Sequence, residues 1–172
     1  MTSGNILTTE RTLVDRITLN DAPFFFELMN SPGWLRYIGD RGIADIDAAH
    51  RVIRDAYLKV YEEHGFGYYV IKASIDLRPI GICGFLKKPH LSNPDFGFAM
   101  LPDYHGQGLA REACTAILQF GVRSFDFSIL DAVTKPSNLR SIRLLEQLNF
   151  CPHGLIEPEN GEEALALYRW DG

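Results

Sequence analysis

The sequence has no long hydrophobic run. No apolar stretch approaches the roughly 20 residues that a membrane-spanning helix needs. The opening residues, MTSGNILTTER, also lack the unbroken apolar segment of a secretory signal. These two absences predict a cytoplasmic protein with no membrane partner.

Cysteine is scarce as well. The three cysteines, Cys83, Cys114 and Cys151, are odd in number, far apart in the chain and flanked by apolar residues. This pattern favours buried thiols over a disulfide framework or a zinc site. We therefore expect no metal centre.

Basic residues are too few and too dispersed to form a stripe. The chain has 22 acidic and 17 basic residues and a net charge of −5. Binding to nucleic acid normally needs clustered positive charge to neutralise phosphates. Nucleic acid is therefore not an expected partner, although one small pocket could still hold an anion.

Glycine and proline divide the remaining sequence into helical and extended segments. With 172 residues, 46% of them hydrophobic, we expect a single domain over residues 1–172. Periodicity predicts strands at 11–17, 68–73, 79–86, 95–101, 130–134, 151–156 and 164–170. It predicts helices at 18–29, 45–63, 110–125 and 138–148, with a break at 30–34 and a turn at 158–163. The strand-helix-strand unit over 95–134 favours parallel neighbours, so the fold class is α/β with a mixed sheet flanked by helices.

Two glycines lie where the strand at 95–101 gives way to a helix. Without side chains at Gly106 and Gly108, successive backbone N–H groups can converge on one point, towards which the helix also directs the positive end of its dipole. A diphosphate would fit there, but a tight turn that needs positive φ would explain the same glycines. The segment is neither a P-loop nor a complete G-x-G-x-x-G dinucleotide motif.

Longer motifs carry a family resemblance. The chain resembles the GNAT acyl-CoA N-acyltransferases in two segments, PDFGFAMLPDYHGQGLAREA and, after it, NLRSIRLLEQLNF. Within the first segment, the pattern LPDY-x-G-x-G-x-A-x-EA resembles their RimJ/RimL-type branch. ILTTERTLV and GYYVIK…PIGICGF are similar to that branch too. The resemblance implies about seven strands and about four helices, with the family's fourth and fifth strands, here 95–101 and 130–134, splayed apart.

The resemblance also implies acetyl-CoA as co-substrate. It places the coenzyme diphosphate around His105, Gly106, Gln107, Gly108, Leu109 and Ala110. The pantetheine arm would pair with backbone groups of Phe98 and Met100 on the fourth strand, and Ala99 between them is a further expected coenzyme-binding residue. The side chains of Phe98, Ala99 and Met100 also have a plain core interpretation.

The helix at 138–148 agrees with the branch in part. Asn138 and Ser141 match its N-x-x-S positions, so the resemblance implies that Asn138 contacts the coenzyme and that the Ser141 hydroxyl lies near the thioester sulfur as a proton donor. Spacing alone favours a helix cap for Asn138 and a solvated position for Ser141. Leu145 stands where relatives commonly carry a tyrosine that acts as the general acid and protonates the departing thiolate. Asn149 replaces a glycine, and we expect it to adopt the left-handed conformation.

Asp95 is the expected general base, because many relatives carry an acidic residue there; His90 and His105 are the alternatives. Cysteine nucleophiles are disfavoured because no histidine adjoins Cys83 or Cys114.

The acceptor pocket is expected near 34–40, the 86–94 loop and the turn near 160. Trp34 and Tyr37 are the candidate acceptor-binding residues, with Phe66 and Tyr69 as further members of an aromatic wall. Aromatic side chains at these spacings more often belong to the core, which is the alternative interpretation.

These observations favour an N-acetyltransferase that transfers the acetyl group of acetyl-CoA to a primary amine, either a small molecule or a peptide N-terminus, by direct attack in a ternary complex. A non-catalytic acyl-CoA-binding module is the alternative, because the usual tyrosine is missing. A different nucleotide-binding α/β protein is a third interpretation. Dimers are frequent in the family, so a homodimer is a further expectation.

Overall fold

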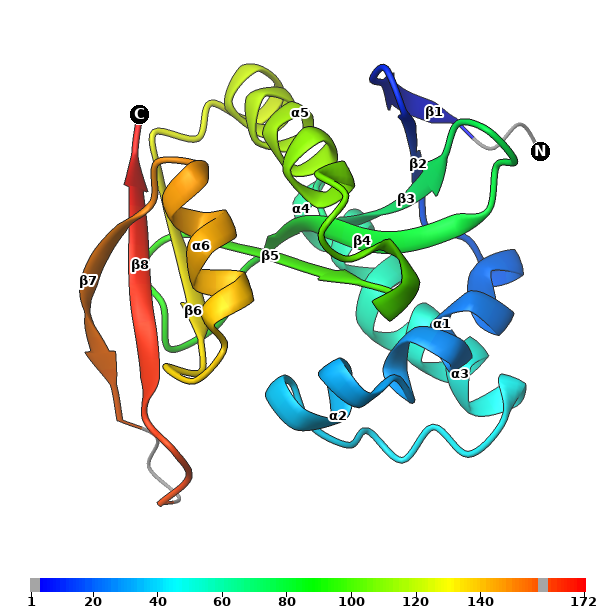
Figure 1. Ribbon diagram of the computed structural model, residues 1–172, viewed down its shortest axis with the longest axis horizontal. Coiled ribbons are helices and arrows are strands. Elements are labelled where there is room, and N and C mark those ends of the chain that lie inside the picture. The colour runs from blue at the N-terminus through cyan, green and yellow to red at the C-terminus, as the bar shows by residue number, and fades with distance from the viewer. Residues whose placement is uncertain (1–3, 158–160) are drawn as a thin grey trace.

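The computed structural model describes residues 4–157 and 161–172, whose strands form one eight-stranded sheet in the order β1-β2-β3-β4-β5-β6-β8-β7 (Figure 1). The predicted mixed sheet is confirmed. The strands are β1 Asn5–Thr8, β2 Thr12–Arg16, β3 Tyr68–Ala73, β4 Pro79–Leu86, β5 Asp95–Met100, β6 Ile129–Thr134, β7 Cys151–Ile156 and β8 Leu165–Asp171.

Helices precede β3 and flank the later strands. They are α1 Ala22–Met29, α2 Pro32–Tyr37, α3 Ile46–Val52, α4 Lys59–His64, α5 Leu109–Phe125 and α6 Leu139–Gln147. A π-helical segment, Ile53–Leu58, joins α3 to α4 and makes the single long helix that the periodicity predicts. Gly65 ends this helix with φ +75°, a conformation that glycine adopts without a steric penalty.

The sheet has two halves. Strands β1 to β5 form an antiparallel meander, while β6, β8 and β7 form a second antiparallel group. The halves meet through the parallel pair β5 and β6, in which only Asp95 and Asp131 are in register. Figure 1 shows the two strands diverging beyond this point. The predicted splay is therefore present, with its closed end at the start of β5.

Two hydrophobic clusters cover opposite faces of the first half. Phe85, Phe96 and Ile117 belong to the cluster under α5 and α6. Val70 and Ile82 belong to the cluster under α1 and α3. Successive residues of a strand point to opposite faces, so β5 directs Phe96 towards α5 and its odd-numbered residues towards α1. We call the latter the α1 face of the sheet.

Two elements differ from the prediction. Helix α2 begins inside the segment 30–34 that was predicted as a break, because Pro32 occupies the first turn of this helix, where a missing N–H costs nothing. The additional strand, β1, has four residues, too few for a clear alternation. Residues 158–160 of the predicted turn lie outside the described residues.

The expectation of three buried thiols is wrong for Cys151. Cys83 and Cys114 are buried, whereas Cys151 is exposed. The reason is its position on β7, which forms the edge of the sheet and whose residues are almost all exposed. Within residues 4–157 and 161–172, no helix combines the length and apolar character of a membrane span.

Candidate active site

Five consecutive residues, 106–110, form the turn that leads into α5 and the first residues of that helix. Gly106 and Gly108 have φ of +73° and +78°, so the chain turns twice before the 17-residue helix begins. In the described part of the chain, the N–H groups of residues 106–110 donate no hydrogen bond to the protein. The space where Gly106 would carry a Cβ is open. A helix N-terminus with free amides of this kind binds anions.

Side chains of the phosphate loop, residues 105–110, tie it to the segment that precedes it and to α6. Gln107 Nε2 donates to the Asp103 carbonyl at 2.7 Å. His105 Nε2 donates to the Met100 carbonyl at 3.0 Å, and its Nδ1 accepts from the guanidinium of Arg140 on α6. Burial lowers the pKa of His105, and the neighbouring Arg140 lowers it further, so the ring is neutral near pH 7. With both nitrogens engaged, His105 positions the loop and offers no free nitrogen as a base.

The hydrogen-bond pattern of β5 determines which residues face the splay. Leu101 N–H donates to the Ile80 carbonyl of β4 at 2.8 Å, and the pairing alternates along an antiparallel ladder. Ala99 therefore also directs its backbone groups to β4. The N–H and carbonyl groups of Phe98 and Met100 point instead towards β6, although His105 occupies the Met100 carbonyl.

The opposite edge belongs to β6. Gly172 N–H donates to the Ser128 carbonyl at 3.1 Å, so the even-numbered residues of β6 pair with β8. Val133 therefore directs its backbone groups towards β5. Phe98 and Val133 therefore face the splay from its two sides, and an extended chain bound there would pair with them like a missing strand.

Two buried aspartates mark the closed end of the splay. Asp131 accepts from Arg169 Nε at 2.8 Å and from Asn93 Nδ2 at 3.0 Å. Although burial favours the protonated acid, hydrogen bonds from Arg169 and Asn93 lower the pKa of Asp131 overall. Asp131 is thus a fixed anion that holds β6, β8 and the loop before β5 together.

Asp95 behaves differently. Its side chain is 3% exposed, its Oδ2 lies 2.8 Å from Lys88 Nζ, and its Oδ1 has no hydrogen-bond partner among the described residues. Burial raises the pKa of Asp95, and the charges of Lys88 and His90 offset this only in part. A carboxylate whose pKa is raised is a better proton acceptor than an ordinary aspartate.

Helix α6 supplies the residues expected near the sulfur. Asn138 Oδ1 accepts from Ser141 N–H at 3.3 Å, which confirms the predicted helix cap. Ser141 is half-buried in the first turn. Leu145 is 1% exposed and belongs to the hydrophobic cluster under α5 and α6, so a core side chain occupies the position of the usual tyrosine. Contact of Asn138 or Ser141 with a coenzyme stays a prediction.

The end of α6 has the predicted left-handed residue. Asn149 has φ +66°; its N–H donates to Glu146 and the Phe150 N–H donates to Leu145. This pair of bonds is a Schellman motif, so asparagine replaces the expected glycine without loss of the helix end.

The candidate acceptor residues lie on α2. Trp34 is 5% exposed, packs in the α1 cluster, and its Nε1 has no partner in the described part of the chain. Tyr37 is half-buried, with the Arg36 guanidinium over its ring. Lys135 Nζ donates to the Arg36 carbonyl at 3.1 Å, so α2 reaches across to the end of β6. Acceptor binding by Trp34 and Tyr37 stays a prediction.

The other aromatic candidates lie elsewhere. Phe66 and Tyr69 pack in the α5 cluster, on the opposite face of the sheet from Trp34, so the four rings do not form one wall. His90, the remaining alternative base, is exposed in the loop before β5.

A comparison with known proteins decides the family. Residues 11–151 match the family model described as "Acetyltransferase (GNAT) domain". The chain belongs to the GNAT acetyltransferase family. The resemblance drawn from the motifs is thereby confirmed, and the match includes both the phosphate loop and α6.

Individual GNAT proteins share the whole architecture. The chain is 26% identical over 151 residues to the "Uncharacterized N-acetyltransferase p20" of Bacillus licheniformis, covering 87% of this chain and 84% of that protein. An acetyltransferase structure from Agrobacterium tumefaciens str. C58 superposes with a TM-score of 0.80 at 22% identity, covering 96% and 94% of the two chains. RimL, a ribosomal L7/L12 alpha-N-protein acetyltransferase solved in complex with coenzyme A, gives 0.77 at 13% identity, covering 98% of each chain. These structural likenesses establish the fold.

Two residues of this GNAT domain were missed in the sequence. The hydroxyl of Tyr68 on β3 occupies the space that a Cβ on Gly97 would fill, on the same face as Asp95. Burial, and secondly the charge of Asp95, raises the pKa of Tyr68 well above its ordinary value. Arg11 contacts the phosphate loop from the β1–β2 turn. The ILTTERTLV and GYYVIK segments, which contain Arg11 and Tyr68, contributed to the family resemblance, but neither residue was singled out.

The buried thiols do not suit nucleophilic chemistry. Burial raises the pKa of Cys83, and a hydrogen bond with Cys114 raises it further, which disfavours the thiolate. Among residues 4–157 and 161–172, no group of three or more histidine, cysteine or acidic side chains is placed to hold a metal ion.

Proposed function

We propose that the protein is an N-acetyltransferase that uses acetyl-CoA to acetylate a primary amine by direct attack in a ternary complex. The observation that carries this proposal is the row of free backbone N–H groups at residues 106–110, placed at the open end of the splay between β5 and β6. The N–H groups suit a diphosphate, and the splay suits the long, extended arm that is joined to it.

The residues present fit such a coenzyme. The amides of residues 106–110 would hold the diphosphate, and Phe98 and Val133 would pair with the pantetheine arm. Asn138, whose carboxamide caps α6, lies on the element that borders this path. When bound, acetyl-CoA supplies an activated acetyl thioester, whose thiol has a pKa near 8.5 and is a tolerable leaving group.

In this proposal Asp95 would take a proton from the attacking amine. Its side chain lies on the α1 face at the closed end of the splay, and its unpartnered Oδ1 remains able to accept a hydrogen bond. Lys88 Nζ lies 2.8 Å from Oδ2, so Oδ1 is the oxygen that would accept the proton of the amine. The Ser141 hydroxyl would donate to the departing sulfur. RimL, named for acetylating a protein N-terminus, supports a peptide N-terminus as one acceptor.

One observation favours a rival. Because Leu145 is buried where relatives commonly carry tyrosine, the protein could bind acyl-CoA without turnover. Release of free coenzyme A in the presence of small primary amines and N-terminal peptides separates the two hypotheses. Chromatography is the appropriate detection, since the exposed Cys151 would itself react with a thiol reagent.

Acceptor-dependent release of coenzyme A, lost in Asp95→Asn, is the expected result. Asp55→Asn, which changes an exposed carboxylate far from the splay, is the matched control and should keep full activity. Tight binding of acetyl-CoA with no turnover on any amine would support the binding module, and absence of acetyl-CoA binding would contradict both hypotheses.

A further inference from the structure

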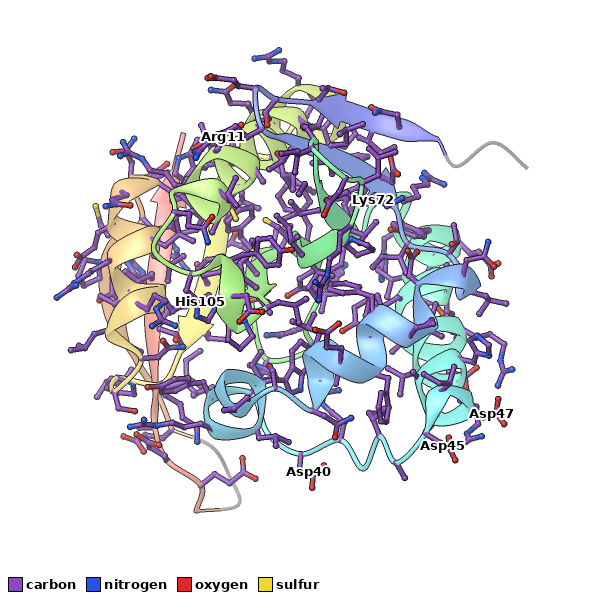
Figure 2. The ribbon with its side chains drawn as sticks, turned by 45° about the vertical axis from the view of Figure 1, so that its right-hand side comes forward. Arg11, Asp40, Asp45, Asp47, Lys72 and His105 are labelled. Carbon is purple, nitrogen blue, oxygen red and sulfur yellow. The ribbon has the colours of Figure 1, made fainter. Side chains whose placement is uncertain are left out.

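Arg11 links the N-terminal turn of the sheet to the phosphate loop. It follows β1 and precedes β2, and Figure 2 shows it beside α5. Its Nη1 donates to the Gln107 carbonyl at 2.9 Å, and its Nε donates to Glu112 Oε2 at 2.8 Å. One guanidinium therefore contacts both the loop and the first turn of the helix that follows it.

Glu112 is itself fixed by the same turn. Its Oε1 accepts from Arg11 N–H at 2.7 Å and from Thr9 Oγ1 at 2.6 Å. These hydrogen bonds and the Arg11 charge lower the pKa of Glu112 overall, although burial opposes them, so it is an anion near pH 7. The Arg11 side chain, 48% exposed, is thus held by acceptors on two sides.

The remaining guanidinium nitrogen faces the glycine turn. Nη2 lies 3.3 Å from the position that a Cβ on Gly108 would occupy. No acceptor is recorded for Nη2 in the parts of the chain that the structure describes. A positive charge beside the free amides of the loop would strengthen their attraction for a diphosphate.

We propose that Arg11 is a coenzyme-binding residue. Nη1 and Nε hold the Gln107 carbonyl and Glu112, which orients the amides of the phosphate loop, and Nη2 supplies a cation to the diphosphate. Arg11 also neutralises Glu112, whose negative charge would otherwise lie near the bound phosphates. This inference rests on the proposed function, since it assumes that the loop binds acetyl-CoA.

Calorimetry on the full chain tests the role of Arg11. Arg11→Gln should weaken acetyl-CoA binding by about tenfold or more, because a charge-assisted contact and the loop anchor are both lost. It should leave binding of acetyl-pantetheine, which lacks the diphosphate, at the wild-type level. Arg11→Lys keeps the charge but not the planar fork, so its affinity for acetyl-CoA should lie between those of wild type and Arg11→Gln.

Arg54→Gln is the matched control. Arg54 makes a similar exposed Nε-to-carboxylate contact, 2.9 Å to Asp55, on the π-helical segment far from the loop, and its replacement should not change either affinity. The salt dependence of acetyl-CoA binding is a second readout: it should be shallower in Arg11→Gln than in wild type.

Acetyl-CoA affinity and salt dependence equal to wild type in Arg11→Gln would overturn the proposal, as would an equal loss for acetyl-CoA and acetyl-pantetheine. Should Arg11→Gln fail to fold by circular dichroism, the same comparisons with Arg11→Lys decide. A wild-type protein that binds no acetyl-CoA would instead refute the proposed function.

Discussion

At the scale of single residues, the two aspartates at the closed end of the splay have opposite electrostatic character. Asp95 and Asp131 are paired across β5 and β6, and both are almost fully buried. Arg169 and Asn93 surround Asp131 with donors, whereas Asp95 has one lysine and an unpartnered oxygen. The raised pKa of Asp95 and the lowered pKa of Asp131 follow from this difference.

The raised pKa of Asp95 predicts how stability depends on pH. Below the ordinary value of 3.8, the folded and unfolded states both hold the proton. As pH rises, the unfolded state releases it first, so the contribution of Asp95 to the free energy of unfolding is lost by the time pH passes the raised folded pKa. Asp95→Asn should lack this loss. Its free energy of unfolding in urea should therefore exceed that of wild type by a margin that widens as pH rises from about 3.5 to about 7.

Asp131→Asn serves as the comparison of opposite sign. Its stabilising contribution is present above the ordinary aspartate range and is lost as pH falls through its lowered folded pKa. The variant should therefore be less stable than wild type at pH 7, with a deficit that shrinks in acid. If the free energy of unfolding changed with pH in the same way for wild type and Asp95→Asn, burial would not raise the pKa of Asp95.

At the scale of elements, the start of α5 depends on backbone conformation. Gly108→Ala should cost about 1 kcal/mol of stability, because an L-residue at φ +78° is strained. Gly42→Ala is the matched control, since Gly42 has φ +65° and open space around it on the loop before α3. Both variants should lose similar stability in urea, but only Gly108→Ala should weaken acetyl-CoA binding in calorimetry. Equal acetyl-CoA affinity in the two variants would remove Gly108 from the coenzyme site.

Elements with a strong repeat could be predicted from the sequence. Strand β3 and helix α5 have clear periodicity, and the glycines at Gly65 and Gly108 mark where helices end or begin. The π-helical segment within the long helix was not predictable, because its apolar spacing is that of an ordinary helical face. The short strand β1 depends on pairing with β2, which local sequence does not encode.

The site was predictable where its chemistry is local and not where it depends on tertiary contacts. The phosphate loop and the Asn138 cap involve neighbouring residues, so short motifs reveal them. Arg11 and Glu112 are separated by 101 positions, and Tyr68 meets Gly97 only through strand packing. The sequence motifs predicted a coenzyme site but gave no information on these long-range contacts.

At the scale of the whole molecule, the sheet is two antiparallel halves that meet at one end. The open end of β5 and β6 leaves unpaired backbone groups at Phe98 and Val133, directly before the amides of the phosphate loop. A bound coenzyme would pair with these backbone groups and so complete the sheet. Without the coenzyme, water would have to supply their hydrogen bonds. Asp95 and α2 lie on the α1 face, and the proposed function requires the amine to approach from this side.

A crystal structure of the protein with acetyl-CoA tests this central claim most directly. The account predicts diphosphate oxygens within hydrogen-bond distance of the N–H groups of residues 106–110. It also predicts the pantetheine arm between β5 and β6, with the thioester facing Asp95. A coenzyme bound elsewhere on the molecule, with these amides left to solvent, would contradict it.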